Sequence, residues 1–169
     1  MPISEEVRSH GYVLLQLWEQ LSSNLPNANF NLSTGSSRSA YVIQSNIPAM
    51  LGRGRKASAG IFVKVSNKRA SPWRYAFLQQ HQDEIKALKD EYGEVFVAFV
   101  NGQDGVACVD YSVLKLVLDE HHQDQEWVAI TRKLHQNYRI SGKDGDGERL
   151  LPKNNFPQAI VKYFLGVIG

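Results

Sequence analysis

The chain has 169 residues, 43% of them hydrophobic and 21% charged, which is typical of a soluble globular protein, and this length predicts a single domain. Its one cysteine, Cys108, excludes an intrachain disulfide. The apolar runs are far shorter than the roughly 18 residues that span a bilayer, and the N-terminal segment carries acids where a signal peptide carries positive charge. We therefore expect a cytoplasmic protein that does not insert into a membrane.

The net charge of +2 conceals an uneven distribution. Residues 20–82 contain no Asp or Glu, so residues 1–82 carry nine basic and three acidic side chains, whereas residues 83–169 carry ten basic and 14 acidic ones. The first part thus has a net charge of +6 and the second a net charge of −4. Such asymmetry indicates an anionic partner or electrostatic pairing of the two halves, and a solvated basic face is the alternative.

In chain order, the first predicted element is a helix over residues 4–22, where a serine can cap the first turn and apolar residues recur at helical spacing. A polar stretch follows, in which residues 40–44 form a short predicted strand. Residues 52–60, GRGRKASAG, are typical of a flexible basic loop, because glycines disfavour regular structure and like charges repel. Residues 59–66 then predict a second strand, with Lys64 inside its apolar run.

The rest of the chain alternates helices and strands. Residues 67–77 predict a basic turn, and residues 78–92 predict a helix from their apolar spacing. The later predicted elements are strands 94–100, 106–111, 126–134 and 137–141, a helix 113–121 capped by Ser112, and a last helix 157–165 that opens with Pro157. This order predicts a single mixed α/β domain with a central mixed β-sheet flanked by helices.

No local motif assigns a cofactor, and we predict none. The glycines of LGRGRKASAG lack the strand–loop–helix context and the lysine–serine spacing of a phosphate-binding loop. The histidines and Cys108 have no zinc-ligand spacing, and Cys108 within VACVDY is typical of a small core residue. The acids of KDGDGE lack the other ligands of a calcium loop and indicate a polar surface turn.

The surroundings of Lys64 have the residue types of a nucleic-acid-binding surface. Cations neutralise phosphates and aromatic faces stack on bases, and both kinds of residue occur in GRGRK, NKR and SPWRY beside the lysine strand. Trp73 and Tyr75 fit core positions on an edge strand equally well. The candidate nucleic-acid-binding residues are Arg53, Arg55, Lys56, Lys64, Lys68, Arg69, Trp73 and Arg74.

The order of the predicted elements resembles that of the PD-(D/E)xK nucleases, the superfamily whose restriction-endonuclease-like fold Holliday junction resolvases share. There, a helix leads to a strand with an Asp, then to a strand with an acid-x-Lys, a helix and two further strands. The motif IFVK, residues 61–64, stands where such enzymes have a sequence such as IEVK. The resemblance extends over residues 4–118, so residues 1–118 are the expected nuclease-like core and residues 119–169 a C-terminal extension.

Lys64 is the one residue that matches the catalytic set of this superfamily. Phe62 replaces the acid two positions earlier, and the strand 40–44 has no Asp. The resemblance implies Mg²⁺-dependent phosphodiester hydrolysis, in which carboxylates hold the metal, yet residues 20–82 contain no carboxylate. We therefore expect a non-catalytic nucleic-acid-binding protein on a nuclease-like scaffold.

Two alternatives remain open. The first is a metal-dependent nuclease that uses Mg²⁺ and takes its carboxylates from elsewhere in the chain. Its candidate residues are Lys64, Gln82 and Glu84, with Glu5 or Glu6 as further carboxylates. The second is a protein–protein interaction module, for example a homodimer in which the basic half of one chain faces the acidic half of the other.

Overall fold

The helix α1 (Glu5–Asn24) opens the fold, as its sequence predicts. A computed structural model describes residues 2–47 and 55–168 of the chain. The Val7 amide donates a hydrogen bond of 3.2 Å to the Ser4 hydroxyl and so caps the first turn of α1. The buried stripe of this helix consists of His10, Val13, Leu17 and Leu21.

Five strands form the first sheet, and one helix lies between its third and fourth strands along the chain. These elements are β1 (Asn29–Thr34), β2 (Ala40–Ile47), β3 (Arg55–Ser66), α2 (Gln79–Tyr92), β5 (Val95–Asn101) and β6 (Gly105–Asp110). The spatial order is β1-β2-β3-β5-β6. Neighbouring strands are antiparallel except β3 and β5, which are parallel because the chain crosses back through α2.

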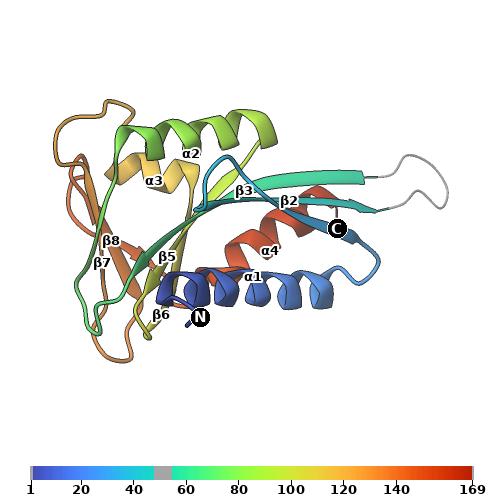
Figure 1. Ribbon diagram of the computed structural model, residues 1–169, viewed down its shortest axis with the longest axis horizontal. Helices are drawn as coiled ribbons and strands as arrows, with labels where there is room; N and C mark the ends of the chain where they lie inside the picture. Colours follow the sequence, from blue (N-terminus) through green and yellow to red (C-terminus); the bar gives the residue numbers. More distant parts are fainter. Residues whose placement is uncertain (1, 48–54, 169) are drawn as a thin grey trace.

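Helices cover both faces of this sheet (Figure 1). The helices α2 and α3 (Tyr111–Val117) lie on one face, and α1 and α4 (Asn155–Ile168) lie on the other. Successive residues of β3 alternate between the two cores: Phe62 packs beneath α2, whereas Ile61 and Val63 pack against the α1 and α4 side. At Gly60 the helix α2 comes so close that an added Cβ would lie 2.7 Å from the Leu88 Cβ.

The second sheet contains four antiparallel strands in the order β4-β7-β8-β9. Their bounds are β4 (Trp73–Ala76), β7 (Trp127–Thr131), β8 (Tyr138–Gly142) and β9 (Arg149–Leu151). Strand β4, from the middle of the chain, pairs with β7 from its C-terminal part, while α4 returns to the first sheet and packs against α1 and β6. Residues 119–169 thus supply β7, β8 and β9 to the second sheet and α4 to the first.

The predicted mixed α/β class is confirmed, but several details of the prediction are wrong. The strands β1, β4 and β9 are not predicted, and residues 55–60 belong to β3 rather than to a flexible loop. The cap of α3 is Asp110, whose carboxylate accepts a hydrogen bond of 2.9 Å from the Val113 amide, instead of Ser112. No helix in the described ranges combines the length and apolarity needed to cross a membrane.

Candidate functional site

Lys64 lies on the face of β3 that α2 covers, and its ammonium group contacts the end of β4. Its Nζ donates a hydrogen bond of 2.6 Å to the Ala76 carbonyl, lies 3.5 Å from Nδ1 of His81, and sits 4.9 Å from the centre of the Phe77 ring. Burial lowers the pKa of Lys64 to about 8. Among the described residues, none of the ion pairs involves Lys64. The lysine is thus bound by a carbonyl and aromatic rings.

Apolar side chains occupy the positions where the resemblance would require acidic residues. Ala40 of β2 is the register partner of Phe62 of β3, and both side chains are fully buried. The Phe62 ring lies 5.7 Å from the His81 ring. Burial, followed by the charge of Lys64, lowers the pKa of His81. This arrangement offers an apolar wall beside Lys64 where a metal site would need carboxylate oxygens.

Among the described residues, none of the other nuclease candidates forms a hydrogen bond or an ion pair with Lys64. Glu84 accepts a hydrogen bond of 2.9 Å from the Ser36 hydroxyl, and Gln82 is buried with its Nε2 3.1 Å from Nδ1 of His122. Glu5 pairs with Arg8 at 3.1 Å; it and Glu6 begin α1, which covers the opposite face of the sheet from Lys64. Within the described ranges, no cluster of three or more Asp, Glu, His or Cys residues has the geometry to hold a metal ion.

The predicted basic surface is divided between the two ends of β3. Lys56 is exposed near the start of this strand, about 33 Å from its end at Ser66 at the usual rise of a strand. Lys68 and Arg69 are exposed in the turn beyond that end. Lys68 donates a hydrogen bond of 2.8 Å to the Pro72 carbonyl, and Arg74 stacks 4.2 Å from the Trp127 ring centre. Arg53 lies outside the described residues, and Arg55 is the first residue of β3.

Trp73 is a core residue. It is 2% exposed, and its Nε1 donates a hydrogen bond of 2.8 Å to the Lys68 carbonyl. The neighbouring Tyr75 is also buried, and its hydroxyl donates to Oδ1 of Asn101 at 2.6 Å. Both side chains point inward from β4, an edge strand of the second sheet, in agreement with the alternative interpretation of SPWRY. Trp73 therefore has no free ring face for a nucleic-acid base.

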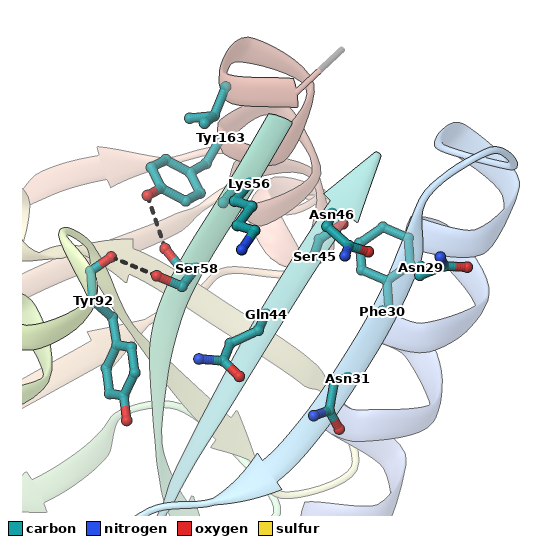
Figure 2. A pocket seen from close by; sticks show the side chains of 12 residues that line it. Asn29, Phe30, Asn31, Gln44, Ser45, Asn46, Lys56, Ser58, Tyr92 and Tyr163 are labelled. Atoms are coloured by element: carbon teal, nitrogen blue, oxygen red, sulfur yellow. Dashed lines mark hydrogen bonds between the residues drawn. The ribbon is translucent and has the colours of Figure 1, made fainter. Parts of the chain in front are cut away.

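A polar surface of the first sheet lies at the opposite end of β3 from Lys64. Cross-strand pairing places Asn31, Gln44 and Ser58 in one row across β1, β2 and β3. Asn29, Asn46 and Lys56 form a second row. Residues paired in this way share one face of the sheet. We call this surface, visible in Figure 2, the amide face; it comprises Asn29, Asn31, Gln44, Asn46, Lys56 and Ser58.

A groove of about 570 Å³ runs along the amide face. One side of it is held by hydrogen bonds around Ser58, whose hydroxyl donates to the Tyr92 carbonyl at 3.1 Å and whose carbonyl accepts from the Tyr163 hydroxyl at 2.9 Å (Figure 2). All six residues of the amide face line this groove, whereas the side chain of Ser45, between Gln44 and Asn46 on β2, points to the opposite face of the sheet and is 4% exposed. The groove thus presents hydrogen-bonding groups to a ligand.

The sequence contains a signal for this surface within its polar stretch. Asn29 and Asn31 alternate with Phe30 and Leu32, and this period of two is typical of a half-buried strand. Comparisons of the chain with protein-family models, with curated proteins and with solved structures found no match.

Proposed function

We propose that this protein binds nucleic acid without hydrolysing it, and that the amide face is its binding surface. The observation that carries the proposal is the chemistry of this face: four carboxamides, one hydroxyl and the ammonium of Lys56 cover three adjacent strands without a carboxylate among them. Carboxamides hydrogen-bond to base edges and phosphates, and an ammonium neutralises phosphate charge. The basic character of residues 1–82 supports the same ligand class.

The topology supports a nuclease-like scaffold for this function. The helix α1, the strands β2 and β3, the crossover helix α2 and the strands β5 and β6 follow the element order expected from the PD-(D/E)xK resemblance, and β1 and β4 are additional strands. The pair Ala40 and Phe62 argues against metal-dependent hydrolysis, because Mg²⁺ requires hard oxygen ligands and these side chains supply hydrocarbon. We include a cytoplasmic location in the proposal, as the sequence suggests.

Fluorescence anisotropy with labelled single-stranded, duplex and branched DNA and RNA at low salt tests the proposal. We expect binding that weakens as salt rises. Lys56→Ala should weaken it about fivefold, the effect of one charge-assisted contact of about 1 kcal/mol. Lys133→Ala is a matched control, because this exposed lysine follows β7 of the second sheet and does not line the groove. Absence of binding to every probe at low salt would end the proposal.

The nuclease alternative is tested in parallel with Mg²⁺ or Mn²⁺. We expect no cleavage of any of the same probes. Cleavage by the wild-type protein that Glu84→Ala loses would establish the nuclease instead and would contradict the non-catalytic proposal.

A second candidate function, self-association, is favoured by the exposed side of α1. Val7, Leu15 and Trp18 are 61%, 55% and 48% exposed. Val7 and Leu15 each lie four residues from Gly11, where no atom lies within 4 Å of an added Cβ. A two-fold axis at Gly11 would therefore place Val7 against Leu15 of a second copy, and self-complementary patches of this kind form dimers.

Sedimentation equilibrium distinguishes this dimer from the electrostatic one that the charge asymmetry suggests. Association through α1 should persist at high salt and be lost in Leu15→Lys. Association that disappears at high salt would favour pairing of the basic and acidic halves, and a monomer at all concentrations would reject both.

A further inference from the structure

The central strand of the amide face carries two carboxamides that are available to a ligand. Gln44 and Asn46 of β2 are exposed, and neither side chain forms a hydrogen bond with another described residue. They lie two residues apart on one face, which corresponds to about 6.8 Å along an antiparallel strand. This spacing matches two base-pair steps of B-form DNA, at about 3.4 Å each.

The chemistry of a carboxamide matches one base edge in particular. Asn and Gln bind adenine in the major groove by accepting a hydrogen bond from N6 and donating one to N7. The major groove of B-DNA is about 12 Å wide and admits a two-stranded ribbon. Adjacent strands of a sheet lie about 4.8 Å apart, so β2 fits the groove together with one neighbouring strand.

The aromatic residues of the groove disfavour single-stranded ligands. Readers of single strands use exposed aromatic rings on which bases stack, whereas Phe30, Tyr92 and Tyr163 are half-buried here. Double-stranded RNA is disfavoured for a different reason, because its deep and narrow major groove is closed to side chains.

We propose that Gln44 and Asn46 read two adenines, two base pairs apart, in the major groove of duplex DNA. This inference rests on the proposed nucleic-acid-binding function and specifies its ligand. Lys56, the register partner of Asn46, contacts a phosphate at the groove edge. The exposed Asp90 and Glu91, at the C-terminal end of α2 beside Tyr92, keep the DNA backbone away from that end of the helix.

Selection from a pool of randomised DNA duplexes identifies the preferred site and tests this inference. We expect a motif with two adenines separated by one base pair. In anisotropy measurements on the selected duplex, replacing either adenine with another base should weaken binding by about 5- to 150-fold. Replacement by 7-deazaadenine, which lacks only the N7 acceptor, should weaken binding in the same direction.

The variant Gln44→Ala/Asn46→Ala should lose this discrimination while it keeps weak, salt-dependent binding. Gln79→Ala/Gln80→Ala is the matched control, because these two exposed carboxamides lie at the start of α2, away from the groove. A thermal melt of each variant checks folding, and an unfolded double variant would be replaced by Gln44→Glu, whose carboxylate repels phosphate and cannot donate to N7. Glu91→Lys should tighten binding.

The outcomes separate the inference from the proposed function. Binding of all duplexes with equal affinity, or discrimination that persists without the two carboxamides, would overturn the reading of adenine and leave nucleic-acid binding in place. A preference for single-stranded DNA or for RNA would also overturn it. Failure to bind any nucleic acid would instead remove the proposed function on which the inference rests.

Discussion

Replacing Lys64 with methionine removes a buried charge and keeps most of the apolar stem. In the native protein the ammonium group is bound by the Ala76 carbonyl and the Phe77 ring, without an ion pair among the described residues. Burial of the charged form therefore costs free energy that these neutral partners do not fully offset. Lys64 should therefore make the stability of the protein depend on pH, and Lys64→Met should remove this contribution.

The direction and size of the effect follow from the pKa of Lys64, which burial lowers from 10.5 to about 8. Between these two values the unfolded chain binds a proton that the folded protein releases, so stability rises with pH in this window. Since one pKa unit corresponds to about 1.4 kcal/mol, the charged lysine costs about 3 kcal/mol at about pH 7 and about 1 kcal/mol at about pH 9.5.

Urea denaturation of both proteins across this pH range measures the effect. The wild-type protein should gain about 2 kcal/mol in unfolding free energy relative to Lys64→Met between about pH 7 and pH 9.5. The difference at any single pH also contains the lost hydrogen bond to Ala76, so the change with pH is the informative quantity. A difference that stays constant within about 0.5 kcal/mol would refute the argument, because it would mean that Lys64 titrates alike in both states.

Three further predictions concern the core and the contact between the sheets. Asp104→Asn should destabilise the protein by about 1 to 2 kcal/mol in urea denaturation, because it weakens the two hydrogen bonds from Arg132 at 2.6 and 2.8 Å. Burial opposes ionisation of Asp104, but Arg132 and a tyrosine hydroxyl lower its pKa on balance. The stability advantage of the wild-type protein over this variant should therefore vanish as the pH falls through the pKa of Asp104. Gly60→Ala should cost about 1 to 3 kcal/mol in the same assay, because the new methyl group would meet Leu88, and an unchanged midpoint would contradict this packing. Cys108, fully buried and with a pKa raised by burial, should react with a thiol reagent only after unfolding, so rapid labelling of the native protein would contradict its position.

The elements with strong apolar patterns could be predicted from the sequence. The helices α1 and α2 have buried stripes at helical spacing, and β5 and β6 are nearly continuous apolar runs, so their type and approximate bounds follow from local pattern. The N-cap at Ser4 depends on a local hydrogen bond, so it can also be predicted from the sequence. In each case the information lies within one short stretch of sequence.

The second sheet could not be predicted because its pairing is not local. Strand β4 has four residues, and it is stabilised by β7, about 50 residues later in the chain. The burial of Trp73 and Tyr75 depends on that partner, so SPWRY fits a basic surface and an edge strand equally well until the pairing is known. Strand β9 has only three residues and depends on β8 in the same way.

The division of the predicted basic surface has a related physical cause. The charge of the sequence predicts one binding surface over the whole basic segment around Lys64. A continuous strand separates the charges of that segment, because β3 extends from Arg55 to Ser66. The amide face depends on the register of three strands, which brings uncharged residues from 29–31 and 44–46 next to Lys56 and Ser58. Composition alone does not determine the register of these strands.

The two lysines of β3, Lys56 and Lys64, therefore have different roles. A hydrocarbon at position 64 would avoid the cost of a buried charge, but it would leave the Ala76 carbonyl, at the end of β4, without the hydrogen bond that Lys64 donates. Through this hydrogen bond, Lys64 joins the first sheet to the second. Lys56, eight residues earlier on the same face of the strand, remains exposed and free to neutralise a phosphate. If this division is correct, removing the charge of Lys64 should change stability and leave nucleic-acid affinity unaltered, whereas removing that of Lys56 should do the reverse.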